Sequence, residues 1–156
     1  MIVKSLSGFL KGIFFRQKHK AELSFSRIKT YIFCPLKYKL IYELGWKEKL
    51  NPQSSLGLSL HRALEEFHRN KEVTLDALYG YLDEYWVNTG FRSAQESYEA
   101  YEHCRNLLKK YFEQWSEEKA EILYIEKDFA FEIGGFRLQG LIDRIDKTPD
   151  GEYEVI

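Results

Sequence analysis

His61 and Asp143 are the residues whose types and spacing best suit metal-dependent chemistry. Glu65 and His68 follow His61 at i+4 and i+7, which places all three on roughly one face of a predicted helix. A histidine with a carboxylate one turn away can bind a metal ion, but a surface or capping histidine more often explains such a pattern. We consider His61 the stronger candidate because its neighbours are apolar, and we expect His68 beside Arg69 to be solvated.

Asp143 lies in a predicted strand that is otherwise built for burial. Aspartate is rare inside strands, and burying its charge is costly unless a cation or hydrogen bonds compensate. Asp143 therefore needs a partner, which is either a metal ion or a basic side chain such as Arg144. Asp146 falls on the opposite side of an ideal strand from Asp143, and we expect it to be a strand-end residue.

The elements that must position these residues are helices in the first part of the chain and strands in the last. Apolar spacing predicts a helix that Ser24 or Ser26 caps, that breaks at Pro35 and that ends at Gly45. Residues 51–55 are predicted to be a loop. Three further helices are expected, over residues 56–70, from Thr74, and from a capping box at residues 93–96, with an aromatic and apolar stripe of Tyr98, Tyr101, Leu108, Tyr111, Phe112 and Trp115 in the core.

After Glu121 the apolar period changes to that of strands. Strands are predicted over residues 123–133, 136–146 and 153–156, with turns at Gly134–Gly135 and at residues 148–151. Consecutive strands joined by tight turns form an antiparallel β-meander. The sequence therefore predicts an α+β fold, in which an N-terminal helical part is followed by this meander.

Charge is distributed unevenly along the 156 residues, although the formal net charge is only -1. Residues 1–49 hold 11 lysines and arginines against 3 acidic residues, and the remainder holds 12 against 21. A basic segment suits a polyanion partner, and the acidic remainder can include metal-binding carboxylates, although most of its acids solvate helix faces. Two cysteines and no long apolar run indicate a cytoplasmic protein without a transmembrane segment.

Residues 1–20 have apolar residues at helical spacing with lysines on the other faces. We divide the chain into this basic amphipathic extension, residues 1–22, and a domain over residues 23–156. The extension either docks on its own domain or makes contact with a membrane surface, the first being favoured.

Several motifs in order resemble the RecB-type branch of the PD-(D/E)XK nucleases, including RecB-family exonucleases and the AddB nuclease domain. They are Ser24-Phe-Ser26-Arg27 with Tyr31 and Cys34-Pro35, Gly57-x-x-x-His61, Glu126 with Phe129, and Leu138-x-Gly140-x-Ile142-Asp143-Arg144-Ile145-Asp146. The resemblance implies that residues 23–156 form the front portion of a restriction-endonuclease-like core. It also implies that His61 and Asp143 are catalytic and bind Mg²⁺ or Mn²⁺.

The same resemblance implies an acid-x-Lys motif on the strand that follows the one with Asp143. This sequence reaches Ile156 just ahead of the expected acid and lysine, so we expect this chain to be inactive alone, as the front part of a nuclease used in DNA repair or recombination. The alternative is a non-catalytic DNA-binding or assembly module that docks to a helicase or nuclease partner. We expect Arg27, Lys29, Tyr31, Lys37 and Lys39 to contact DNA.

Cys34 corresponds to a residue that binds a 4Fe-4S cluster in AddB-like relatives. The other three ligands of such a cluster would lie beyond the motifs present here. We therefore favour a small buried cysteine over an iron-sulfur ligand at this position.

Overall fold

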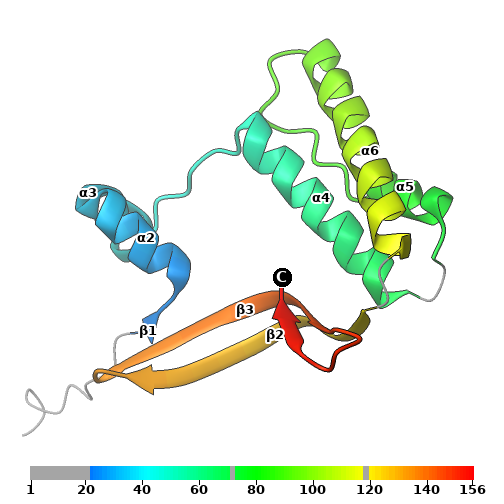
Figure 1. Ribbon diagram of the computed structural model, residues 1–156. Coiled ribbons are helices and arrows are strands. Elements are labelled where there is room, and N and C mark those ends of the chain that lie inside the picture. Colours follow the sequence, from blue (N-terminus) through cyan, green and yellow to red (C-terminus); the bar gives the residue numbers. More distant parts are fainter. Residues whose placement is uncertain (1–21, 71–72, 118–119) are drawn as a thin grey trace, which may run out of the picture.

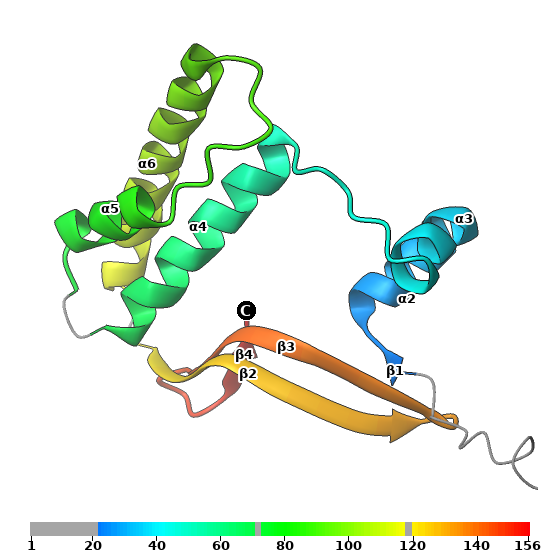
Figure 2. The ribbon, with the colours of Figure 1, turned by 180° about the vertical axis from the view of Figure 1, so that it is seen from behind.

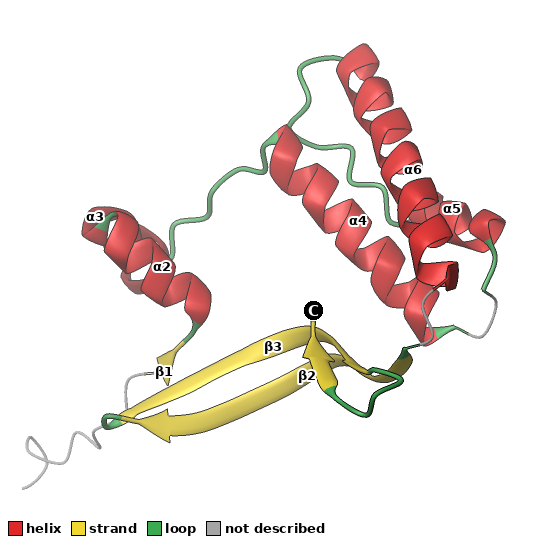
Figure 3. Ribbon diagram, viewed as in Figure 1, coloured by secondary structure: helices red, strands yellow, loops and turns green. Residues whose placement is uncertain are grey.

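The computed structural model describes residues 22–70, 73–117 and 120–156. Figures 1 and 3 show two groups of helices above one sheet, and the view from behind places both groups on the same side of it (Figure 2). This arrangement confirms the α+β prediction. The elements are β1 (Glu22–Leu23), α2 (Phe25–Phe33), α3 (Pro35–Tyr38), the π-helix η1 (Lys39–Glu43), α4 (Pro52–Arg69), α5 (Leu75–Glu84), α6 (Ala94–Glu117), β2 (Glu121–Ile133), β3 (Phe136–Lys147) and β4 (Tyr153–Val155).

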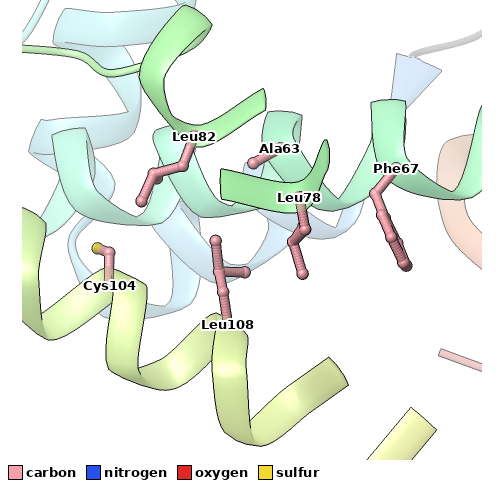
Figure 4. Close-up of a cluster of buried hydrophobic side chains, with 6 residues drawn as sticks. All are labelled: Ala63, Phe67, Leu78, Leu82, Cys104 and Leu108. Carbon is pink, nitrogen blue, oxygen red and sulfur yellow. The ribbon is translucent and has the colours of Figure 1, made fainter. Parts of the chain in front are cut away.

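The hydrophobic core lies between α4, α5 and α6 (Figure 4). Tyr101, Phe112 and Trp115 pack against it as predicted, whereas Tyr98 is 60% exposed and lies outside the core. Tyr98 is near the N-terminus of α6. The core therefore holds α4 firmly from one side and leaves its other side available to the sheet. The buried side chains are Ala63, Phe67, Leu78, Leu82, Cys104 and Leu108.

Helix α4 begins four residues earlier than the sequence pattern suggested, so the predicted loop over residues 51–55 is wrong. Asn51 is the N-cap, and its side chain accepts a hydrogen bond of 2.8 Å from the backbone of Ser54. Pro52 at the first helical position has no amide hydrogen to lose. Ser55 is buried and donates to the carbonyl of Thr89, which ties the first turn of α4 to the loop before α6.

The break at Pro35 is confirmed, and Cys34 organises it. Ser24 caps α2 by accepting a hydrogen bond from the backbone of Arg27, and α2 ends at Phe33. The Cys34 sulfur then accepts a hydrogen bond of 3.4 Å from the backbone of Lys37 and so caps α3. Cys34 thus has a structural role in the described chain, although it is half-buried and not buried as predicted.

Strand β3 is the centre of the sheet. It pairs antiparallel with β2 along one edge and antiparallel with β4 at the far end of the other edge. The predicted meander is confirmed, and both Gly134 and Gly135 of its first turn have the positive φ that such a turn requires. The two-residue strand β1, which was not predicted, pairs parallel with β3 at Arg137 and Leu138, so the sheet is mixed.

The predicted amphipathic extension over residues 1–22 lies almost wholly outside the described residues, and a membrane contact by residues 1–20 therefore remains a prediction. Among the residues that are described, no helix is both long enough and apolar enough to cross a bilayer.

Candidate metal centre

His61, Glu126 and Asp143 come together from three elements, α4, β2 and β3. The Nε2 atom of His61 lies 3.0 Å from a carboxylate oxygen of Glu126, and the Nδ1 atom lies 3.6 Å from one of Asp143. One ligand atom from each of the three residues falls within 4.8 Å of the others. Within the described ranges, this is the one group of three or more such residues close enough to share a metal ion.

The hairpin of β2 and β3 brings the two carboxylates together. Ile125 pairs with Arg144 and Lys127 pairs with Ile142, so Glu126 and Asp143 occupy facing positions between these pairs. Facing residues on antiparallel strands have side chains within contact distance of each other. The register of the hairpin alone therefore brings together Glu126 and Asp143, which are 17 positions apart in the sequence.

Glu126 has a backbone φ of 52°, which is unusual for a residue with a side chain. The left-handed region costs a non-glycine residue about 1–3 kcal/mol, and such strain concentrates at functional sites. No other non-glycine residue in the described segments has a positive φ. The strain marks Glu126 as a position where the backbone conformation has been held for a reason other than stability.

The charges of the centre favour a cation. Glu126 is largely buried, with 13% of its side chain exposed, whereas Asp143 is 61% exposed. Two carboxylates this close repel each other unless a positive charge lies between them. A divalent cation bound by oxygen ligands, together with the neutral imidazole of His61, would relieve that repulsion. The three residues therefore fit a divalent metal ion.

Gly140 leaves room for the Phe129 ring in the hairpin of β2 and β3. It pairs with Phe129 across the two strands, and a Cβ atom added to Gly140 would lie 2.8 Å from the Phe129 ring. Real Cβ atoms are essentially never this close to another heavy atom, so the Phe129 ring would have to shift if residue 140 had a side chain. In contrast, a Cβ at Gly57, the other motif glycine, would meet nothing within 4 Å.

Arg144, the basic residue that the sequence offers as a partner for Asp143, pairs with another residue. Arg144 is 8% exposed, and its Nη2 atom forms an ion pair of 2.9 Å with Asp146, not with Asp143. Asp146 is the last residue but one of β3, as predicted, yet it is only 2% exposed, so its side chain lies inside the protein. Since Arg144 is engaged with Asp146, Asp143 is left available for a metal ion.

His68 is also not solvated as predicted. It packs against Phe67, Tyr111 and Trp115, and its Nε2 atom lies 2.9 Å from the Nη1 atom of Arg144. Burial, followed by the charge of Arg144, lowers the pKa of His68 to about 4, so the ring is neutral near pH 7. The sequence indicated a solvated His68 because the next residue, Arg69, is charged, but Arg69 lies on the exposed face of α4 and His68 does not.

A cavity of about 140 Å³ connects the metal centre with this second histidine. Its lining includes His61 and His68 of α4, together with Asp143 and Arg144 of β3, which contact them. The lining residues are His61, Leu64, Glu65, His68, Tyr111, Ile125, Glu126, Asp143, Arg144 and Ile156.

The five residues expected to contact DNA all lie on α2, α3 and η1, whereas the residues of the metal centre lie on α4, β2 and β3. Arg27 donates to the carbonyl of Glu22 and lies over the Tyr42 ring, and Lys37 forms an ion pair with Glu48. Tyr31 is exposed and makes an edge contact with Tyr38. Lys29 and Lys39 are exposed as well. The segment therefore offers a mixture of engaged and exposed basic groups.

Glu126 is the site residue that sequence reasoning did not promote. It was noted as part of a motif with Phe129, yet a single glutamate in a charged strand gives no signal of its own. The useful signal would have been the hairpin register, because counting back from the Gly134–Gly135 turn places residue 126 opposite residue 143.

Comparison with known families gives one match. A family model described as the PD-(D/E)XK nuclease superfamily matches residues 22–156. A search of curated proteins finds no match to this sequence.

Proposed function

This chain belongs to the PD-(D/E)XK nuclease superfamily, and from that premise we propose that it forms the metal-binding part of a DNA nuclease of RecB-family exonuclease or AddB type. The observation that carries the proposal is the convergence of His61, Glu126 and Asp143 from three elements. Members of the superfamily are generally nucleases, so the substrate class is DNA. The exonuclease type and a role in repair or recombination belong to the proposal.

In this proposal, His61 and the two carboxylates bind the divalent ion. When bound there, such an ion supplies charge neutralisation at the scissile phosphate and lowers the pKa of an attacking water. Glu126, which is largely buried, would hold the ion through a carboxylate with little solvent around it. Asp143, which is mostly exposed, would hold it through a carboxylate that solvent and a phosphodiester can reach.

The donor set favours Mn²⁺ over Mg²⁺ in affinity. Carboxylate oxygens suit both ions, but an imidazole nitrogen binds Mn²⁺ better than it binds the harder Mg²⁺. We therefore assign Mg²⁺ or Mn²⁺ as the cofactor and expect Mn²⁺ to be the more sensitive probe. We do not include a 4Fe-4S cluster in the proposal, because Cys34 caps α3 and Cys104 is buried among the core helices.

The basic segment from α2 to η1 is proposed to hold the DNA backbone. Arg27, Lys29, Lys37 and Lys39 supply positive charge, and Tyr31 supplies an exposed ring on which a base can stack. This segment and α4 lie on the same side of the sheet (Figures 1 and 2). A strand bound along the segment can thus reach the side of the sheet that α4 covers. The two unpaired cysteines fit a cytoplasmic location, which is part of the same proposal.

Metal binding is the decisive test because it needs only the three described side chains. Calorimetric titration with Mn²⁺ should show one site in the wild type, with the dissociation constant raised more than about tenfold in His61→Ala and in Asp143→Asn. Asp128→Asn, an exposed change of the same charge on β2, is the matched control and should bind as the wild type does. Equal binding in all four proteins would overturn the proposal.

Hydrolysis is tested in parallel with end-labelled DNA and Mn²⁺. The chain alone is expected to be inactive, and any release of nucleotides that it does show should disappear in Asp143→Asn and remain in Asp128→Asn. Activity that survives Asp143→Asn would show that the metal centre described above does not perform the reaction.

A second candidate is a non-catalytic DNA-binding or assembly module that docks to a helicase or nuclease partner. The observation that favours it is the apolar exposure around α2 and α3, where Phe25, Ile32, Phe33 and Leu36 are all mostly accessible. This module would bind DNA without requiring Mn²⁺. DNA affinity that is the same with and without Mn²⁺, and the same in Asp143→Asn, would favour it over the nuclease.

A further inference from the structure

Arg144 connects three separate elements of the protein. From strand β3, its Nη1 atom lies 2.9 Å from Nε2 of His68 on α4 and 2.5 Å from the hydroxyl of Tyr111 on α6. Its Nη2 atom forms the ion pair with Asp146. One buried side chain therefore ties both long helices to the strand that also carries Asp143.

The chemistry of the donors fixes the protonation state of this network. An arginine can only donate, so both His68 Nε2 and the Tyr111 oxygen accept from Arg144. The Tyr111 hydroxyl oxygen also lies 2.6 Å from His68 Nε2. His68 must consequently be neutral in the folded protein, with its hydrogen on Nδ1.

Helix α4 is thus held to β3 at two points. His61 contacts Asp143, and seven residues later His68 contacts Arg144, the next residue of the strand. Seven residues are about two turns, or about 10 Å, along a helix. A helix fixed at one point can still pivot, whereas two fixed points set its direction.

We propose that Arg144 is a positioning residue, which fixes α4 against the sheet through His68 and so sets where His61 lies. The inference rests on the proposed function, because it concerns the same metal centre. Misplacing a ligand by a fraction of an ångström weakens a metal site, and partners one step beyond the ligands commonly change affinity about 10- to 100-fold.

Asp146 forms an ion pair with Arg144 and so compensates its positive charge. Without it, the guanidinium would be free to pair with Asp143, the preceding residue, and would compete with a metal ion for that carboxylate. The ion pair is buried on both sides, with Arg144 8% and Asp146 2% exposed. The pairing therefore keeps the negative charge of the metal centre available.

The test replaces the buried ion pair as a unit, with Arg144→Met and Asp146→Leu in one protein. Apolar replacement of both partners of a buried ion pair is often tolerated, so the fold should survive, as circular dichroism and thermal melting would show. We expect the Mn²⁺ dissociation constant to rise about tenfold. The number of water molecules on bound Mn²⁺, from water-proton relaxation, should rise as His61 leaves the ion. Arg92→Met, which removes an exposed arginine, is the control and should change neither quantity.

A double-mutant cycle with His61→Ala separates positioning from a general loss of stability. If Arg144 acts through His61, the paired replacement should weaken Mn²⁺ binding in the wild type but add little in the His61→Ala background. Should the paired variant not fold, His68→Met removes the same tie and leaves the Arg144–Asp146 pair intact.

Two outcomes are distinguishable. Wild-type Mn²⁺ binding that is unchanged in the folded variant, or a full additional loss in the His61→Ala background, would overturn this proposal and leave the metal centre standing. No Mn²⁺ binding by the wild type would overturn the proposed function itself, and this inference with it.

Discussion

Glu126 faces Asp143 across two antiparallel strands, although its backbone adopts a conformation that glutamate normally avoids. The pairs on either side, Ile125–Arg144 and Lys127–Ile142, hold the register that places the two carboxylates together. The protein therefore accepts both backbone strain and charge repulsion at one position. Binding of a cation would compensate for both.

Glu126→Asn should separate stability from metal binding. Asparagine adopts the left-handed conformation more readily and carries no charge, so the metal-free variant should be as stable as the wild type or up to about 1 kcal/mol more stable. Mn²⁺ at about 100 times its dissociation constant should stabilise the wild type by about 2.7 kcal/mol and the variant by much less. Urea unfolding with and without Mn²⁺ measures both. A metal-free variant less stable by more than about 2 kcal/mol would contradict the strain argument.

Gly140→Ala should destabilise the hairpin that carries the centre. The new Cβ would lie 2.8 Å from the Phe129 ring, and overpacking of this kind costs about 1–3 kcal/mol. Phe129→Leu should cost less in the Gly140→Ala background than in the wild type, which a double-mutant cycle by urea unfolding would detect. Gly57→Ala, where the added Cβ meets nothing, should instead be neutral or stabilise α4 by about 0.5–1 kcal/mol. Similar losses at both glycines would refute the assignment.

His68 predicts a specific loss of stability in mild acid. Its pKa is about 4 in the folded protein and about 6.5 when the chain is unfolded, so above pH 6.5 the ring is neutral in both states and contributes no pH dependence. Between these values the unfolded chain takes up the proton and the folded protein does not, so the free energy of unfolding falls as the pH is lowered. Below about pH 4 both states are protonated and this contribution levels off.

His68→Gln should therefore flatten the dependence of unfolding free energy on pH between about 6.5 and 4. His103→Gln, which changes an exposed histidine on α6, should leave that dependence as in the wild type. Urea unfolding at several pH values checks both. An equal slope in the wild type and in His68→Gln would mean that His68 does not stay neutral in the folded protein.

DNA binding should depend unequally on the basic residues of the N-terminal helices. Lys37 already pairs with Glu48, whereas Lys29 and Lys39 are exposed, so Lys29→Gln and Lys39→Gln should weaken binding more than Lys37→Gln. Each phosphate contact that is lost should reduce the dependence of log affinity on log salt by about 0.7–0.9. Fluorescence anisotropy of a labelled oligonucleotide over a salt series measures this slope. Lys110→Gln on α6 is the control, and a slope change there of the same size would contradict the assignment.

Much of the fold could be predicted from local chemistry. Caps and breakers such as Ser24, Pro35 and Thr74 act within one turn, and they appear in the structure where the sequence places them. The tight turn at Gly134–Gly135 likewise needs only its own two residues. The predicted start of α4 is four residues too late because Asn51 and Pro52, which are typical of loops, are here the N-cap and the first residue of the helix.

The parts that could not be predicted depend on contacts distant in sequence. The exposed-looking pair His68–Arg69 hides a buried histidine because Tyr111 and Arg144 arrive from α6 and β3. Asp146 has no local feature that reveals its burial beside Arg144. The two-residue strand β1 is too short to carry a pattern and exists only through its pairing with β3.

Two short strands, β1 and β4, share the edge of β3 that β2 does not occupy. Strand β1 occupies the edge at residues 137–138, and β4 with the Ile156 backbone occupies residues 144–147. Within the described chain, residues 139–143 between them have no strand on that side. Such an open edge is a template for adding a strand from another molecule. Light scattering at increasing concentration would detect a second copy of this chain that adds a strand at the edge that carries Asp143.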